Sequence, residues 1–193
     1  MLTFLIDVFV YYDIVISMKL ISMIMSSVLT HICLEKAAAA GLEQRTESFA
    51  IVLQGSVAEV MPLFGPLRET EWAPTWAPHF LHPPEGAQRE GVVFKSTTSN
   101  GKEGLWLLTS YNISEGRVEY VSIIPGFTAN EIKIRVVPER NGGSKATITY
   151  RRSALAPDGN EEVTKLDAHW ADRQRAHWET AINAVLTTGS AHD

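Results

Sequence analysis

Six segments of the chain have the alternating apolar and polar positions that are typical of β-strands. The alternation is clearest at Ile132, Ile134 and Val136, which are separated by charged residues. Turn sequences separate the later segments by only a few residues, a spacing that allows antiparallel hairpins but not parallel crossovers. The pattern predicts an antiparallel sheet with one covered and one wet face. The predicted strands are residues 45–53, 92–98, 105–111, 117–124, 131–137 and 145–155.

The last part of the chain has a helical pattern over about residues 161–187. Asn160 is the expected N-cap of this helix, and Gly189 ends it. At steps of 100° per residue one face is apolar along the whole helix, so we expect the helix to cover the sheet. The residues predicted on the apolar face are Val163, Trp170, Trp178, Ala181, Ile182 and Val185. Those predicted on the opposite face are Lys165, Asp172, Arg175, Glu179 and Asn183, and His169 points to that side.

Two short helices are predicted between the first two strands. Ser56 is a suitable N-cap for the first, over residues 57–64, and Gly65-Pro66 ends it. The following segment, residues 67–84, begins as a second short helix and becomes a loop rich in aromatic residues and proline. This loop is unusually apolar for a connection.

Three polar residues, Asp167, Gln174 and His177, fall within the apolar face of the predicted C-terminal helix. A buried polar side chain without a partner costs about 1–3 kcal/mol, so these residues need partners or a wet pocket. One interpretation is that each bonds to the sheet or to a neighbour on the helix. The other makes His177 a hydrogen-bond donor or general base, tuned by Asp167 or Tyr150. Asp167 and His177 are about 15 Å apart along a helix, which excludes a direct pair.

Composition excludes several classes of function. The 193 residues carry 17 Lys and Arg against 22 Asp and Glu, a net charge of −5, and offer no basic face for nucleic acid. The single cysteine, Cys33, forms no intrachain disulfide, and no nucleophile elbow or glycine-rich phosphate loop is present. His79 and His82 have an H-x-x-H spacing, but no further ligands cluster near them. The sequence therefore predicts no metal and no cofactor.

An apolar leader, residues 1–42, differs in composition from the rest of the chain. Its longest stretch without Asp, Glu, Lys or Arg, Leu20–Leu34, has 15 residues, fewer than the roughly 20 that span a bilayer as a helix. Read from Met18, the leader is similar to a secretory signal, with Lys19 as a positive start and Ala37–Ala40 as a small-residue cleavage site. This interpretation predicts a periplasmic or secreted protein. The alternative is a tail that stays on a cytoplasmic protein.

The order strand, two short helices, five strands and long helix resembles the helix-grip fold of the START-like and Bet v 1-like (SRPBCC) superfamily, which includes polyketide cyclase and dehydrase relatives. The resemblance assigns residues 43–188 to one α+β domain, with a curved antiparallel sheet of about six strands wrapped around the C-terminal helix and residues 189–193 as a tail. It implies a hydrophobic cavity between sheet and helix. Three stretches add to the likeness: Glu71-Trp72-Ala73-Pro74-Thr75-Trp76, Arg117-Val118-Glu119-Tyr120-Val121 and Thr147-Ile148-Thr149-Tyr150-Arg151.

The sequence leaves three functions open. The first is binding or carriage of a small apolar molecule, without catalysis, in the implied cavity. The second is an enzyme of the cyclase, dehydratase or hydrolase kind that uses His177 and a tyrosine. The third is a protein-interaction module that binds a partner through its sheet or aromatic loop. The side chains predicted to contact a ligand are Trp72, Trp76, Phe80, Trp106, Tyr120, Tyr150, Asp167, Trp170, Gln174 and His177.

Overall fold

A computed structural model describes residues 41–98 and 101–189 of the chain. The chain divides into two units, Met1–Gly41 and Leu42–Asp193, and the fold described below belongs to the second. The predicted signal starting at Met18 and its cleavage site lie outside the described residues.

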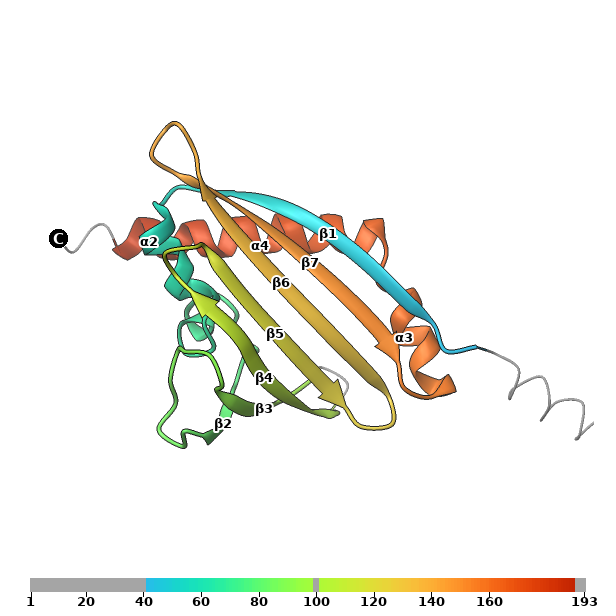
Figure 1. The fold of residues 1–193 in the computed structure, drawn as a ribbon. Coiled ribbons are helices and arrows are strands. Elements are labelled where there is room, and N and C mark those ends of the chain that lie inside the picture. Colours follow the sequence, from blue (N-terminus) through green and yellow to red (C-terminus); the bar gives the residue numbers. More distant parts are fainter. Residues whose placement is uncertain (1–40, 99–100, 190–193) are drawn as a thin grey trace, which may run out of the picture. The chain divides into compact units, whose positions relative to one another are not determined.

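A single antiparallel sheet with the strand order β1-β7-β6-β5-β4-β3-β2 forms the body of the domain. The sheet is strongly curved, and the long C-terminal helix runs along one of its faces (Figure 1). This arrangement is the predicted helix grip. The strands are β1 (Gln44–Leu53), β2 (His79–His82), β3 (Val93–Thr97), β4 (Glu103–Asn112), β5 (Arg117–Ile124), β6 (Thr128–Pro138) and β7 (Ser144–Ala154).

The described residues form seven strands, because the loop rich in aromatic residues contributes β2 at one edge of the sheet. Phe80 of β2 lies opposite Phe94 of β3, and the register shifts between Phe80 and His82. A strand of four residues has too short a pattern to be recognised by its period. Its pairing comes from the edge of β3, which offers unpaired backbone groups.

Short helices connect the first two strands and precede the long C-terminal helix. They are α2 (Val57–Val60), the 3-10 turns η1 (Met61–Phe64), η2 (Arg68–Glu71) and η3 (Pro157–Gly159), and α3 (Asn160–Thr164). The C-terminal helix α4 spans Ala168–Gly189. The prediction of one helix over residues 161–187 is therefore wrong.

Asp167 explains where the predicted helix breaks. Its Oδ1 accepts a hydrogen bond of 2.7 Å from the backbone N–H of Trp170, so Asp167 caps the start of α4. Asp167 itself is exposed, while the preceding Leu166 is fully buried. A side-chain cap of this kind satisfies a backbone donor that has no partner within the helix. The break between the two helices allows Leu166 to be buried in the core. The continuous helix predicted from the sequence does not require Leu166 to be buried.

The alternation predicted for the strands is confirmed by burial. Ile132, Ile134 and Val136 of β6 are buried, whereas Lys133 and Arg135 between them are exposed. The inward face of the sheet packs against α4 through residues such as Trp178 and Ile182. Apart from the exposed Pro138 at the end of β6, the even-numbered positions of β5, β6 and β7 belong to this inward face. Burial of apolar side chains on this face is the main source of stability.

Two residues predicted on the outer face of the long helix instead bind the edge of β1. Glu179 accepts a hydrogen bond of 3.1 Å from the N–H of Val52. Asn183 accepts one of 2.9 Å from the N–H of Gln54 and donates one of 3.0 Å to the carbonyl of Val52. β1 is an edge strand, so its outer backbone groups have no neighbouring strand. The helix covers this edge and thereby satisfies those groups.

Candidate functional site

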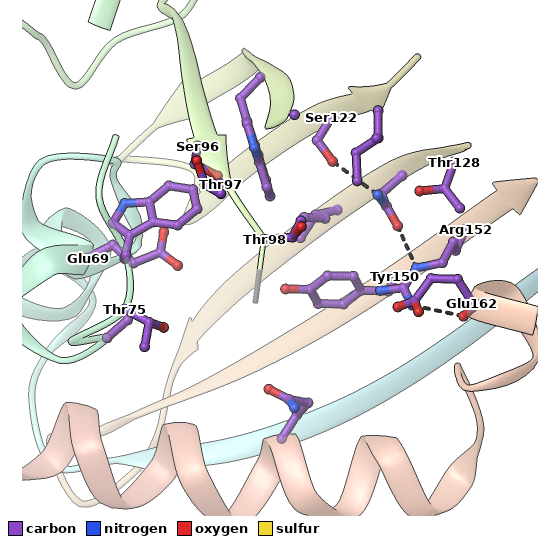
Figure 2. Close-up of a pocket in the computed structure, with 18 of the residues that line it drawn as sticks. Glu69, Thr75, Ser96, Thr97, Thr98, Ser122, Thr128, Tyr150, Arg152 and Glu162 are labelled. Atoms are coloured by element: carbon purple, nitrogen blue, oxygen red, sulfur yellow. Dashed lines mark hydrogen bonds and ion pairs between the residues drawn. The ribbon is translucent and has the colours of Figure 1, made fainter. Parts of the chain in front are cut away.

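A cavity of about 660 Å³ lies between the inward face of the sheet, the turn η2 with the loop after it, and the helices α3 and α4 (Figure 2). Exposed side chains, among them Thr75, Lys165 and His177, form its rim and leave it open to solvent. The volume lies within the range of small-molecule sites in proteins.

Indole rings form the apolar wall of the cavity. Trp72 donates its Nε1–H to the carbonyl of Leu63 at 2.7 Å, and Trp76 donates its own to the carbonyl of Pro66 at 2.9 Å. Trp76 also packs edge-on against Trp106, with ring centroids 5.1 Å apart. Because the N–H groups of Trp72 and Trp76 are already paired, these side chains offer carbon surface to the cavity rather than donors.

The polar end of the cavity is a chain of hydrogen bonds that joins three strands and a helix (Figure 2). Arg152 on β7 donates from Nε to Oδ1 of Asn130 on β6 at 2.8 Å. Asn130 donates in turn to Oγ of Ser122 on β5 at 3.1 Å. Arg152 Nη1 also bonds to the Glu162 carboxylate of α3 at 3.1 Å. Burial lowers the pKa of Arg152 from its ordinary value, and Glu162 partly offsets this effect.

Two titratable side chains, Glu69 and Tyr150, face the cavity from opposite sides (Figure 2). Burial raises the pKa of Glu69 to about 8, although part of the side chain can be reached from the cavity. The carboxyl group is therefore mostly protonated at neutral pH. Burial, and secondly the negative charge of Glu69, raise the pKa of Tyr150 above its ordinary range. Because the charge of Glu69 changes the pKa of Tyr150, the two groups lie close enough within the cavity to interact electrostatically.

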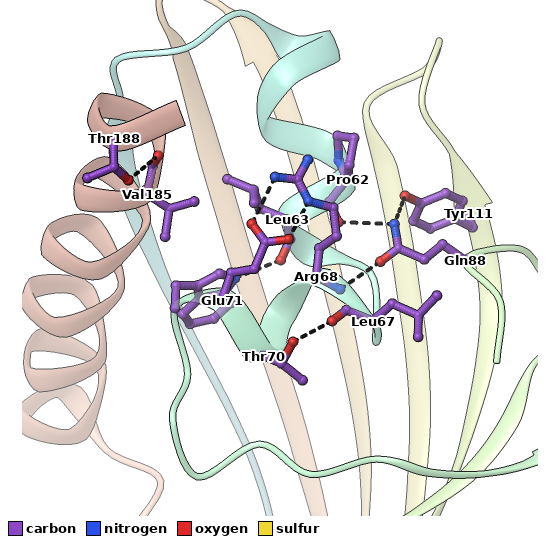
Figure 3. Close-up of polar contacts among 11 residues, drawn as sticks. Pro62, Leu63, Leu67, Arg68, Thr70, Glu71, Gln88, Tyr111, Val185 and Thr188 are labelled. Atoms are coloured by element: carbon purple, nitrogen blue, oxygen red, sulfur yellow. Dashed lines mark hydrogen bonds and ion pairs between the residues drawn. The ribbon is translucent and has the colours of Figure 1, made fainter. Parts of the chain in front are cut away.

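The turn η2 that carries Glu69 is held in place by Gln88 (Figure 3). Gln88 accepts a hydrogen bond from the N–H of Arg68 at 2.9 Å and donates to the carbonyl of Pro62 at 3.2 Å. A second donation from Gln88 reaches the Tyr111 hydroxyl at 3.2 Å. These bonds tie the two 3-10 turns to β4, so that Glu69 has a defined position over the sheet.

Six of the ten side chains predicted to contact a ligand line this cavity. They are Trp72, Trp76, Trp106, Tyr150, Gln174 and His177. The remaining four, Phe80, Tyr120, Asp167 and Trp170, are not part of its lining. Phe80 packs against Phe94 with centroids 5.7 Å apart, and the Tyr120 hydroxyl donates to the carbonyl of Phe64 at 2.8 Å. Trp170 packs on Phe49 and Tyr150.

The prediction that Asp167, Gln174 and His177 lie on a buried helical face is wrong for two of them. Asp167 and His177 are exposed, whereas Gln174 is half-buried. Asp167 precedes α4 and caps it. His177 lies at the open rim of the cavity, where solvent reaches the helix face that points toward the sheet. His169 is exposed, as predicted.

The polar end of the cavity was missed by the sequence analysis, although a signal for it exists. Ser122, Asn130 and Arg152 fall on the same even-numbered positions as the buried apolar residues of their strands. Three inward polar residues on adjacent strands indicate a polar patch. Glu69 has no comparable signal, because a turn of four residues shows no period.

Within the described parts of the chain, no three His, Cys, Asp or Glu side chains gather in a way that suits a metal ion. His79 and His82 both lie exposed on β2. Over the same described ranges, no helix has the length and apolar character needed to cross a membrane.

A scan of the sequence against protein-family models and a search of curated proteins both find no match. Solved structures do match. Ara h 8.0201 superposes with a TM-score of 0.54 at 13% identity over 76% of this chain and 99% of its own. Norcoclaurine synthase from Thalictrum flavum superposes with a TM-score of 0.56 at 12% identity, over 76% of this chain and 88% of its own. A protein of unknown function from Staphylococcus aureus gives 0.55 at 15% identity, over 78% and 98%.

These similarities define the class of fold. The domain has the Bet v 1-like helix-grip fold, as the order of elements in the sequence indicates. At such low identity the likeness concerns the fold, and the function has to be argued from this chain's own cavity.

Replacing Arg152 by Met is expected to lower the free energy of unfolding by about 1–2 kcal/mol. The change keeps the apolar stem of the side chain but leaves Asn130 without its donor, and Glu162 with Lys165 alone, in a half-buried place. The matched control is Arg151→Met, since Arg151 pairs with Glu131 at the surface and such pairs contribute about 1 kcal/mol or less. Urea denaturation measures both. Equal losses would mean that the polar chain adds nothing beyond a surface ion pair.

Proposed function

We propose that this protein binds a small, largely apolar molecule with one or more polar groups in the cavity between the sheet and α4. The observation that carries the proposal is the lining: indole rings on one side, with the N–H groups of Trp72 and Trp76 already paired, and the Arg152 chain of hydrogen bonds on the other. Such a site takes up the apolar surface of a ligand and orients the ligand through its polar end.

The cavity also favours binding of a small molecule over the alternative that the protein is an interaction module for another protein. Trp72 and Trp76 belong to the wall of a hollow, with Trp72 almost fully buried, and do not form an exposed apolar patch. An aromatic patch used for protein docking would present its rings to solvent.

An enzyme that moves protons is the second candidate, and one observation favours it. Glu69 and Tyr150 have raised pKa values and face the same cavity, and such groups are common at catalytic sites. In this second candidate function, Glu69 rather than His177 carries the proton. His177 lies at the rim of the cavity, where water competes with a ligand for hydrogen bonds to its ring. The carrier function requires only the lining, so it remains the leading proposal.

The proposed function is tested by filling the cavity. Anilinonaphthalene sulfonate, a dye that fluoresces in apolar surroundings, is expected to bind the folded protein with a stoichiometry near one. Gln174→Trp places an indole into the cavity from α4, since Gln174 lines the cavity and is half-buried. We expect it to weaken dye binding by roughly tenfold or more, which corresponds to about 1.4 kcal/mol.

Arg173→Trp is the matched control, because Arg173 is the exposed neighbour of Gln174 on the same helix and is not part of the lining. It adds the same ring without filling the cavity, so dye binding should stay close to that of the unchanged protein. Fluorescence titration gives affinity and stoichiometry, and circular dichroism checks that both variants are folded. A dye that does not bind, or that binds equally to both variants, would contradict the proposed function.

A further inference from the structure

Glu69 differs from the other charged side chains that line the cavity. Arg152 pairs with Glu162 at 3.1 Å, and Lys165 pairs with Glu161 and Glu162, at 3.3 Å each. The Glu69 carboxyl forms no hydrogen bond or ion pair with any of the residues that the structure describes. The cavity therefore holds one acidic group to which none of the described residues supplies a counter-charge.

The nearest basic residue in sequence does not neutralise Glu69. Arg68 makes two bonds to the Glu71 carboxylate, from Nε at 2.7 Å and from Nη2 at 2.9 Å (Figure 3). That pair is partly exposed, outside the cavity lining. Because Arg68 is bound to Glu71, it does not pair with Glu69. The Glu69 carboxyl therefore faces the cavity without this basic neighbour as a partner.

Aromatic rings surround the same end of the cavity. Trp72, Trp76 and Trp106 line it together with Glu69, and the electrostatic influence of Glu69 reaches the hydroxyls of Tyr120 and Tyr150. The faces of indole rings carry partial negative charge and attract cations. A carboxylate accepts hydrogen bonds and donates none, so its natural partner is a group rich in donors.

We propose that Glu69 and the neighbouring indoles form a binding site for the protonated amine of an aromatic or other apolar ligand. This inference rests on the proposed function and names the class of ligand that the cavity takes. The ammonium group donates to the carboxylate and lies against the rings, while the apolar part of the ligand fills the remaining cavity. The polar end around Arg152 lies across the cavity from this ammonium site (Figure 2).

The proposal predicts that binding depends on pH. Glu69 has to lose its proton to pair with an ammonium ion, and its pKa of about 8 keeps it mostly protonated at pH 6. The affinity for an amine should therefore rise by about tenfold from pH 6 to pH 7 and further toward pH 8. The other titratable or charged groups that line this space are Tyr150, Arg152, Glu162, Lys165 and His177, and the Tyr120 hydroxyl lies within the electrostatic influence of Glu69.

The test compares tryptamine with 3-ethylindole, which has a similar shape and no amine, by isothermal titration at pH 6, 7 and 8. We expect tryptamine to bind more tightly as pH rises, and 3-ethylindole to show little dependence. Glu69→Gln keeps the size of the side chain and removes its charge, so it should abolish both the preference for tryptamine and the rise with pH. Asp172→Asn is the control, because it removes a carboxylate from an exposed position of α4 outside the cavity lining, and it should leave the rise with pH intact.

The outcomes separate this inference from the proposed function. A protein that binds the naphthalene dye but shows no advantage of tryptamine over 3-ethylindole would overturn the ammonium site and leave the proposed function standing. The same holds if tryptamine binds more tightly as pH falls, because the ionised Glu69 carboxylate would then not be the group that binds the amine. Failure of the dye and of both indoles to bind would overturn the proposed function itself.

Discussion

Replacing Trp178 by alanine is expected to lower the free energy of unfolding by about 3–5 kcal/mol. Only 8% of Trp178 is exposed, and its ring joins β1, the turns and α4. Its centroid lies 5.5 Å from that of Phe49, 4.9 Å from that of Trp72 and 6.4 Å from that of Phe64. Alanine would leave a void among these rings, which a rigid sheet and helix cannot close completely.

The control for this prediction is Trp170→Ala, two turns earlier on the same helix. Trp170 is only half-buried and contacts two rings, those of Phe49 at 6.1 Å and Tyr150 at 5.0 Å. We expect a smaller loss, about 1–2 kcal/mol. Equilibrium denaturation in urea, followed by far-ultraviolet circular dichroism, measures both. If the two variants lost the same stability, Trp178 would not be the central contact between helix and sheet.

Replacing Gly116 by alanine is expected to lower the free energy of unfolding by about 3 kcal/mol, from backbone strain and steric overlap together. Gly116 has a φ of +62°, a conformation that side chains disfavour, and an added Cβ would lie 2.1 Å from the carbonyl oxygen of Val136. The overlap cannot be relieved cheaply, because Gly116 also accepts a hydrogen bond of 2.8 Å from the N–H of Val136. The turn between β4 and β5 would have to move away from β6.

Gly126 allows the two causes to be separated. Its φ of +66° is nearly the same, but nothing lies within 4 Å of the position a Cβ would take. Gly126→Ala should therefore show the conformational cost alone, about 1 kcal/mol. Thermal and urea denaturation of both variants give the difference. A loss at Gly126 as large as that at Gly116 would show that steric contact with Val136 is unimportant.

How far the candidate site could be predicted depends on where each residue lies. Trp72, Trp76, Trp106 and Tyr150 were predicted from the resemblance and from their aromatic character, and they line the cavity. Arg152 was not recognised, although it continues the inward positions of β7. A charged residue near the end of a strand is commonly solvated, and only its neighbours on β6 and α3 turn it into part of a site.

The features that the sequence determines by itself are those that show a local periodic pattern of apolar residues. The strands of the sheet and the apolar face of α4 around Trp178 and Ile182 follow from repeats of two and 3.6 residues. The antiparallel order follows from the short turns between the strands. These repeats exist because each element must turn one face toward a common core, so the information is contained in the element.

Only the tertiary structure decided the features that depend on contacts between distant segments. Four-residue β2 exists because the edge of β3 pairs with it, and the helix breaks before α4 so that Leu166 enters the core while Asp167 caps the next turn. Glu69 belongs to the cavity because Gln88 holds its turn over the sheet and Arg68 is engaged by Glu71. Such contacts join residues that are far apart in the chain or that lie on turns too short to show a periodic pattern. No local sequence pattern therefore predicts them.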